Sequence, residues 1–91
     1  MSVYAYILQC ADGKRYYGST VNLVERLKEH RRGRVRTTSR RLPVRLVYFE
    51  ECPNAEGARR REQSFKNGRT RRSTIDKLIA EFPPDRLVPF A

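Results

Sequence analysis

The most constraining feature of the sequence is the segment Val3–Leu8, in which every residue is apolar or aromatic. A strand with one face in water alternates polar and apolar residues, so an unbroken apolar run predicts a strand that is covered on both faces. A chain of 91 residues has room for one domain with one hydrophobic core. We therefore expect a single domain in which this strand is central.

Two further strands are expected beside it. The dipeptide Asp12-Gly13 follows the apolar run, and both of its residues tolerate the positive φ angles of a tight hairpin turn. Residues 15–18 then return as a second strand. Residues 45–50 are rich in β-branched and aromatic side chains, which predicts a third strand.

Three side chains mark the starts of helices, and they are Asn22, Asn54 and Ser73. Each can cap a helix because its side-chain oxygen accepts a hydrogen bond from a free backbone N–H of the first turn. The apolar residues that follow each cap recur at helical spacing. The three helices are expected to end near residues 31, 66 and 82.

These elements predict an α+β fold, in which a three-stranded antiparallel sheet is flanked by three helices in the order β-β-α-β-α-α. Residues 32–43 lack either periodicity and are expected to form an exposed loop. The domain is expected to cover residues 1–82 and to be followed by a C-terminal tail over residues 83–91.

Positive charge is abundant and segregated. The chain carries 20 Lys and Arg against 10 Asp and Glu, a balance that favours polyanionic partners. Residues 26–45 hold nine basic side chains and residues 59–72 hold seven. If both segments lie on the same side of the sheet, they form a cradle for nucleic acid whose binding weakens with salt; the alternative is a solvated basic surface. The candidate nucleic-acid contacts in and near these segments are Lys14, Arg31, Arg32, Arg40, Arg41, Arg59 and Arg60.

The cysteines and the apolar segments exclude other classes. Cys10 and Cys52 are far apart and have no second cysteine at metal-binding spacing, so we expect two reduced thiols and neither a zinc site nor a disulfide framework. No apolar run approaches the roughly 18 residues that span a bilayer, and no basic segment precedes the first apolar run. We expect a cytoplasmic protein without a membrane partner, and no obligate protein partner is evident.

Polar residues stand where the helices should face the sheet. Arg26 and His30 are four residues apart and border the apolar stripe of the first helix, so both should point toward the sheet. A single histidine in this setting is more often a core-edge residue than a functional one. Glu62 lies between Ala58 and Phe65 on the apolar face of the second helix. A carboxylate there requires either a salt bridge with a residue such as Arg26 or a metal ion, and the sequence leaves both open.

The two hairpin strands each carry a tyrosine, Tyr6 and Tyr16, on either side of the turn. Their spacing around Gly13 makes them candidate cross-strand neighbours. A tyrosine pair on a sheet usually contributes packing. It has a chemical role only if the fold brings it close to Arg26 and Glu62.

Together these residues resemble the GIY-YIG endonuclease superfamily, and most closely its small, single-domain bacterial branch of the URI type. The resemblance rests on Tyr4-Ala5-Tyr6, Tyr16-Tyr17-Gly18, Arg26 with His30, and Glu62, and it covers nearly the whole chain. Tyr4 and Ala5 replace the name-giving Gly and Ile, and Tyr17 replaces the second Ile. The Asn that many family members carry after the metal-binding Glu has no clear counterpart.

The resemblance implies hydrolysis of a phosphodiester by water, assisted by one divalent cation, Mg²⁺ or Mn²⁺, held by Glu62. In this scheme Tyr6 orients or deprotonates the water with Tyr16 hydrogen-bonded beside it, and His30 moves or positions a proton. Arg26 grips the scissile phosphate and Lys66 is a further phosphate contact, unless it is only a solvated cation at a helix end.

The partner implied is DNA, including single-stranded or branched DNA, and RNA is left open. Without a second domain to read a sequence, cutting directed by structure is expected, at single strands, flaps or damaged duplex. Two alternatives follow from the residues themselves. One is a nucleic-acid-binding module with a weak or inactive site, and the other is an adaptor for acidic proteins.

Overall fold

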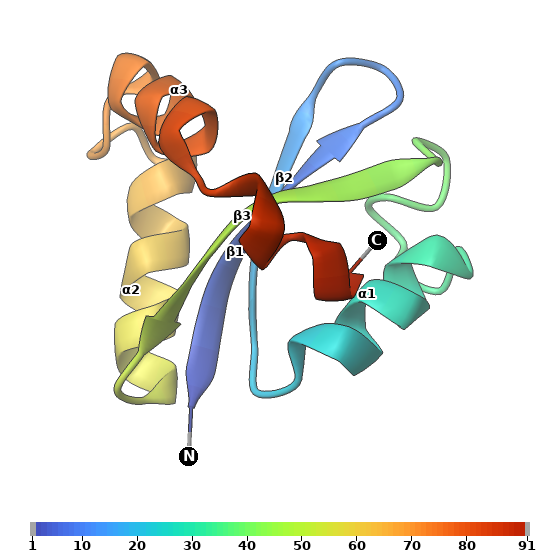
Figure 1. Ribbon diagram of the computed structural model, residues 1–91, viewed down its shortest axis with the longest axis horizontal. Coiled ribbons are helices and arrows are strands. Elements are labelled where there is room, and N and C mark those ends of the chain that lie inside the picture. Colours follow the sequence, from blue (N-terminus) through green and yellow to red (C-terminus); the bar gives the residue numbers. More distant parts are fainter. Residues whose placement is uncertain (1, 91) are drawn as a thin grey trace.

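The computed structural model describes residues 2–90, which form a three-stranded sheet flanked by helices (Figure 1). The strands are β1 (Val3–Cys10), β2 (Arg15–Thr20) and β3 (Val44–Cys52), and the sheet order is β2-β1-β3. Both pairs are antiparallel. The predicted fold class, the hairpin and the central position of the first strand are therefore confirmed. Met1 and Ala91, the outermost residues of the predicted domain and tail, lie outside the described residues.

The helices are α1 (Leu23–Arg31), α2 (Ala55–Lys66) and α3 (Arg72–Glu81). Two of the three predicted caps are confirmed. The Asn22 side chain accepts a hydrogen bond from the backbone N–H of Glu25 at 3.2 Å, and the Asn54 side chain accepts one from Gly57 at 2.7 Å. The sequence therefore encodes the starts of α1 and α2 locally.

The predicted cap of the third helix is wrong. Helix α3 begins at Arg72, so Ser73 lies inside its first turn, and the residue in the cap position is Arg71, whose side chain makes no capping hydrogen bond. The salt bridge between Arg15 and Asp76, at 2.6 Å, ties this helix to β2. Ile75 is buried against the sheet with Phe65 and Ile7. Tertiary contacts thus place a helix start that has no side-chain cap.

The helices cover opposite faces of the sheet, with α1 on one face and α2 and α3 on the other (Figure 1). On the α1 face the core contains Tyr6, Leu8 and Leu27. On the α2 face it contains Ile7 and Phe65. Consecutive residues of β1 therefore enter different halves of the core, as the unbroken apolar run predicts.

The two basic segments lie on these opposite faces as well. Residues 26–45 belong to α1 and the loop after it, whereas residues 59–72 belong to α2 and its connection to α3 (Figure 1). The condition for a single cradle, that both segments lie on the same side of the sheet, is not met. Any nucleic acid that contacts both must pass around an edge of the sheet.

Two local expectations need correction. The loop over residues 32–43 is not exposed throughout, because Val35 and Thr38 are buried in it. In the hairpin turn only Gly13 has a positive φ, 83°. Asp12 instead accepts a hydrogen bond from the backbone N–H of Lys14 at 3.0 Å, so the turn is an Asx turn and not a pair of left-handed residues.

The C-terminal residues pack on the α1 face. Two short 3-10 helices, η1 (Pro84–Arg86) and η2 (Val88–Phe90), return the chain across the sheet. The rings of Phe49 and Phe90 lie 5.2 Å apart in an edge-to-face arrangement. Within residues 2–90, no helix is long and apolar enough to cross a membrane.

Candidate active site

The centre of the candidate site is a buried hydrogen-bond chain on the α1 face. The Tyr6 hydroxyl of β1 lies 2.8 Å from Nε2 of His30, which comes from α1. Nδ1 of the same ring lies 2.8 Å from Oγ1 of Thr38 in the following loop. All three side chains are fully buried, so the imidazole is held at both nitrogens and has no freedom to turn.

Burial sets the protonation of this chain. It lowers the pKa of His30 to about 4, with the nearby Arg26 guanidinium lowering it further, so the imidazole is neutral near neutral pH. Burial also raises the pKa of Tyr6 well above that of an ordinary phenol, although Arg26 opposes that rise. Tyr6 is therefore a protonated phenol that faces a neutral imidazole.

Tyr16 and Arg26 lie beside this chain. The Tyr16 ring meets the His30 ring edge-on at 4.9 Å, and it lies 6.2 Å from the Tyr6 ring. Burial alone would lower the pKa of Arg26, but the phenols of Tyr6 and Tyr16 outweigh it and the pKa is raised. The guanidinium thus lies against both phenols while its side chain stays about one third exposed, at 34%.

The relation between the two tyrosines differs from the expectation. Tyr6 pairs with Gly18 across the hairpin, and Tyr16 pairs with Leu8, so the tyrosines are diagonal and not directly opposite. The hydrogen bond described for the Tyr6 hydroxyl goes to His30, not to Tyr16. Since β1 and β2 are joined by a four-residue turn, the pairing falls two residues away from the one that the spacing indicated.

Gly18 leaves the space that the Tyr6 ring occupies. A Cβ atom built at Gly18 would lie 2.5 Å from the hydroxyl oxygen and from the adjoining ring carbon of Tyr6. Any other residue would displace the phenol. Because β2 is an edge strand, this glycine brings the Tyr6 hydroxyl to the open edge of the sheet.

Glu62 approaches the same edge from the opposite face. It extends from α2, and Oε1 accepts a hydrogen bond from the Ser19 hydroxyl of β2 at 2.9 Å. Oε2 is paired with the Lys66 ammonium one helical turn away. The carboxylate side chain is 14% exposed, and its charge is among the smaller causes, after burial, that raise the pKa of Tyr6.

The pairing of Glu62 decides part of the question that the sequence left open. Its salt bridge is with Lys66, on its own helix, and not with Arg26 across the sheet. Arg26 is paired instead with Glu29 at 3.4 Å. The candidate site therefore straddles β2, with the phenols, imidazole and guanidinium on one side and the carboxylate on the other.

A second polar network fixes the helix that carries Glu62. Arg61 donates from Nε to Oε1 of Glu50 at 2.8 Å, and its guanidinium lies 4.7 Å from the centre of the Phe65 ring. The Tyr48 hydroxyl donates to the same Glu50 oxygen at 2.9 Å, and burial together with this carboxylate raises the pKa of Tyr48 to about 12. These contacts join α2 to β3 and hold the orientation of the adjacent Glu62.

The predicted nucleic-acid contacts are dispersed around the molecule. Arg41 pairs with Asp12 at 3.5 Å, Arg60 pairs with Glu56 at 2.6 Å, and Arg31 donates to the backbone carbonyl of Phe90. The fold does not gather these side chains into one cluster, since they come from the hairpin turn, α1 and its loop, and α2. Those that are exposed without a described ion pair are Lys14, Arg32, Arg40 and Arg59.

Comparison with known proteins agrees with this arrangement. Residues 2–76 match the GIY-YIG catalytic domain. The chain belongs to the GIY-YIG family. Members of this nuclease family act on nucleic acids and generally use divalent metal ions. The resemblance inferred from the sequence is thus confirmed at the level of the family.

The related GIY-YIG proteins are of similar size. A UPF0213 protein of Pediococcus pentosaceus is 44% identical over 76 residues, which are 82% of this chain and 79% of that protein. A UPF0213 protein of Syntrophus aciditrophicus is 42% identical over 87 residues, 92% of this chain and 95% of the relative. The solution NMR structure of a UPF0213 protein from Bacillus halodurans is 36% identical, with a TM-score of 0.53, and covers 88% of this chain and 84% of that one.

The donor set of this GIY-YIG site fits a hard divalent cation. Glu62 supplies carboxylate oxygens and Ser19 a hydroxyl, and Mg²⁺ and Mn²⁺ prefer such oxygen ligands while keeping several waters. Within residues 2–90 no cluster of three or more His, Cys, Asp or Glu side chains has the arrangement of a metal site. One carboxylate alone implies weak binding, and Lys66 already neutralises it.

Two residues that contact the GIY-YIG site had no assigned role in the sequence analysis. Ser19 follows Gly18 directly, so its place after the second motif was the available signal. Thr38 lies in a loop without periodicity, eight residues after His30, and nothing in the local sequence indicates that it is buried. It is found only from the packing of the loop against α1.

Proposed function

We propose that this GIY-YIG protein is a metal-dependent endonuclease that hydrolyses DNA phosphodiester bonds at the edge of β2. The observation that carries the proposal is the 2.8 Å contact between the Tyr6 hydroxyl and Nε2 of His30. It lies beside Arg26 and across the strand from Glu62. Proton-handling, phosphate-binding and cation-binding groups thus meet at one exposed edge.

Tyr6 acts on the attacking water through its oxygen. Thr38 also contacts the Val35 carbonyl, at 3.5 Å. With its hydroxyl proton directed there, Oγ1 accepts from Nδ1–H of His30, and Nε2 is left to accept the Tyr6 proton. The phenol oxygen then has its lone pairs free to accept a hydrogen bond from water. Since the pKa of Tyr6 is raised by burial, the phenol orients the water as a neutral group and does not begin as a phenolate.

Arg26 binds the scissile phosphate. Its guanidinium offers two parallel N–H donors to phosphate oxygens, and the phenols of Tyr6 and Tyr16 hold it at the edge. Donors that are placed before the reaction stabilise the charge that develops on phosphorus oxygens without reorganising. The water attacks in line with the leaving 3′ oxygen.

Glu62 would hold the divalent cation, with Ser19 steadying one carboxylate oxygen. When bound there, Mg²⁺ or Mn²⁺ supplies positive charge that offsets charge on the phosphate and the leaving oxygen. Lys66 balances the carboxylate charge otherwise, and its release on metal binding frees an ammonium for a neighbouring phosphate.

The proposed substrates are single-stranded, flapped or damaged DNA, selected by structure and not by sequence. The site lies at an open edge strand, and residues 2–90 form one domain with no additional module for reading bases. The cations around the edge are spread over both faces, which suits contact with a flexible or distorted backbone.

A second candidate function is a nucleic-acid-binding module with a weak or inactive catalytic site. The observation that favours it is the internal pairing of the key groups, since Glu62 is bound by Lys66 and the Tyr6 phenol is held by His30. The two candidates differ in a single outcome, which is product formation in the presence of metal.

A nicking assay tests the proposal. Wild-type protein is incubated with labelled single-stranded, flapped and duplex DNA in Mg²⁺, Mn²⁺ or chelator, and Glu62→Gln is compared with Glu81→Gln, an exposed carboxylate at the end of α3. We expect cleavage with metal alone, a loss of roughly a thousandfold or more in Glu62→Gln with DNA binding retained, and normal rates in Glu81→Gln. Binding without product in any metal would favour the binding module.

A further inference from the structure

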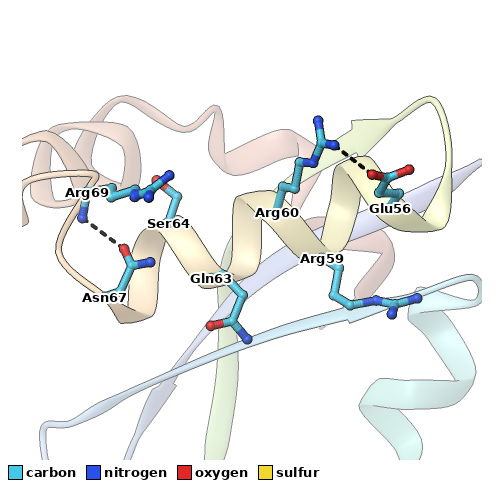
Figure 2. Close-up of a pocket in the computed structure, with 7 residues that line it drawn as sticks. All are labelled: Glu56, Arg59, Arg60, Gln63, Ser64, Asn67 and Arg69. Atoms are coloured by element: carbon cyan, nitrogen blue, oxygen red, sulfur yellow. Dashed lines mark hydrogen bonds and ion pairs between the residues drawn. The ribbon is translucent and has the colours of Figure 1, made fainter.

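The outer face of α2 carries a groove that the proposed catalytic centre does not use (Figure 2). Its volume is about 690 Å³. The side chains that line it come from α2 and from the turn that follows it. They point away from the sheet, whereas Ala58 and Phe65 of the same helix are buried against it.

The groove runs between two rows of side chains spaced four residues apart. One row is Arg59, Gln63 and Asn67, and the other is Glu56, Arg60 and Ser64. Side chains at this spacing form ridges along a helix with a groove between them. Arg69 lies at the end of the groove, where its backbone N–H donates to the Asn67 side chain at 3.0 Å (Figure 2).

The lining has the chemistry of a site for a phosphate backbone. Arg59, Arg60 and Arg69 contribute three guanidinium groups against the single carboxylate of Glu56, which Arg60 binds at 2.6 Å. The Asn67 oxygen is occupied by the Arg69 backbone, so its amide N–H groups remain as donors. Arginines and amide donors together suit the oxygens of a sugar–phosphate chain.

The groove and the carboxylate lie on different flanks of α2. Glu62 faces Ser19 at the edge of β2, and the ridge of Arg59 and Gln63 stands between it and the groove. A helix with its side chains is about 10–12 Å across, and the major groove of B-DNA, about 12 Å wide, admits one. The two flanks are therefore spaced to meet the two strands of one duplex.

We infer that the outer groove of α2 holds the uncut strand of a duplex arm, with α2 in the major groove and the strand to be cut at Glu62. This inference rests on the proposed function and narrows its substrate class. Flapped or damaged duplex becomes the substrate, and a free single strand does not fill the groove. Arg60 and Arg69 hold the uncut strand, and the ridge of Arg59 and Gln63 faces the bases.

The test measures binding without cleavage, in chelator, over a series of salt concentrations. A labelled single strand and the duplex made from it are titrated with wild-type protein, with the double variant Arg60→Ala/Arg69→Ala, and with Lys77→Glu. The last is an exposed residue of α3 outside the groove. Its substitution changes the net charge by the same two units as the double variant does.

We expect the wild-type protein to bind the duplex more tightly than the single strand. The double variant should lose about tenfold in duplex affinity and about two units of log–log salt slope, since each released phosphate contact contributes about 0.9. Its single-strand affinity should change as little as that of Lys77→Glu. An equal loss on both DNA forms, an equal loss in Lys77→Glu, or stronger competition by an acidic peptide than by duplex would each overturn the inference.

Failure of the inference and failure of the nuclease proposal give different results. If the duplex result holds but the wild-type protein makes no product in metal, the groove assignment stands and the endonuclease proposal falls. If flapped DNA is cut but the double variant binds duplex as the wild type does, the endonuclease proposal stands and the groove assignment falls. Thermal melting of the variants confirms that these exposed substitutions leave the fold intact.

Discussion

The two flanks of β2 handle charge in different ways. On the α1 face, Tyr6, His30 and Thr38 are fully buried, neutral near neutral pH, and joined by hydrogen bonds of 2.8 Å. On the α2 face, Glu62 and Lys66 are ionised partners, and Lys66 is largely exposed. One flank thus holds protons in place and the other holds ions. Substrate that reaches the strand edge meets both.

The difference follows from what each kind of group requires. Neutral hydrogen-bonded groups tolerate burial because their desolvation is offset by their partners, and burial then fixes their geometry. A carboxylate that is to exchange a lysine for a metal ion must stay close to water, since burying an unpaired charge costs several kcal/mol. The edge strand is the place in this fold where a buried network and a hydrated ion pair can adjoin.

Arg26 is the one cation that belongs to the buried flank, and its removal should have the largest effect. Arg26→Ala is expected to lose at least a hundredfold, about 3 kcal/mol of transition-state stabilisation, in single-turnover cleavage. Arg26→Lys should recover only part of this loss because an ammonium cannot bind two phosphate oxygens in parallel. Single-turnover rates on flapped DNA in Mn²⁺ measure both.

The control for this prediction is Glu29→Gln. It removes the ion pair that Arg26 makes on α1, at 3.4 Å with a half-exposed partner, and surface pairs of this kind contribute little. Its rate should therefore stay near that of the wild type. Normal turnover by Arg26→Ala would remove the guanidinium from the mechanism and leave the buried flank without a phosphate ligand.

Acid should destabilise the buried flank through His30. Its pKa is lowered from 6.5 to about 4 by burial and by Arg26, while Glu29 opposes the shift. Between these values the unfolded chain binds a proton that the folded protein does not, so stability falls as the pH decreases. The full effect is about 3 kcal/mol, present above the unfolded pKa and lost by about pH 4.

Urea unfolding at a series of pH values measures this loss, and His30→Gln isolates it. The variant is less stable than the wild type at neutral pH, but its stability should change by about 3 kcal/mol less between pH 7 and pH 4 because its side chain does not titrate. Parallel pH curves for the two proteins would mean that the imidazole is not held neutral in the fold.

Local rules predicted much of the fold and part of the site. The apolar run Val3–Leu8 placed the central strand, and Asn22 and Asn54 placed two helix starts, because each signal acts over a few residues. The start of α3 was missed, since it depends on the long-range pair of Arg15 and Asp76. The pairing register of Tyr6 and Tyr16 was misjudged for a similar reason, as the turn geometry sets it.

The site was predictable where helical spacing alone decides which residues share a face. His30 and Glu62 were singled out because each stood on an apolar stripe. Helical spacing does not say on which face of the sheet a helix lies, so the separation of the two flanks by β2 did not follow from it. Thr38 was missed because a loop has no period from which burial can be inferred.

Thr38→Val should give the smallest effect and define how the buried flank works. The substitution keeps the volume and removes the oxygen that contacts Nδ1 of His30, leaving a buried N–H without its 2.8 Å partner. We expect about 1–2 kcal/mol of destabilisation. The cleavage rate should fall by roughly tenfold, because the imidazole can then adopt the other tautomer and donate to Tyr6 in place of accepting from it.

Thr38→Ser restores the hydroxyl and should recover both the rate and the pH profile, whereas Thr37→Val, at an exposed neighbour, should change neither. A purely structural role for Thr38 predicts a loss of stability with a normal rate per folded molecule and an unshifted pH profile. A positioning role predicts a slower rate at saturating DNA, with affinity unchanged, because Thr38 acts only through His30. If Thr38→Val cleaves normally once it is folded, the tautomer of His30 does not matter to the reaction, and the buried flank serves only to hold the Tyr6 ring over Gly18.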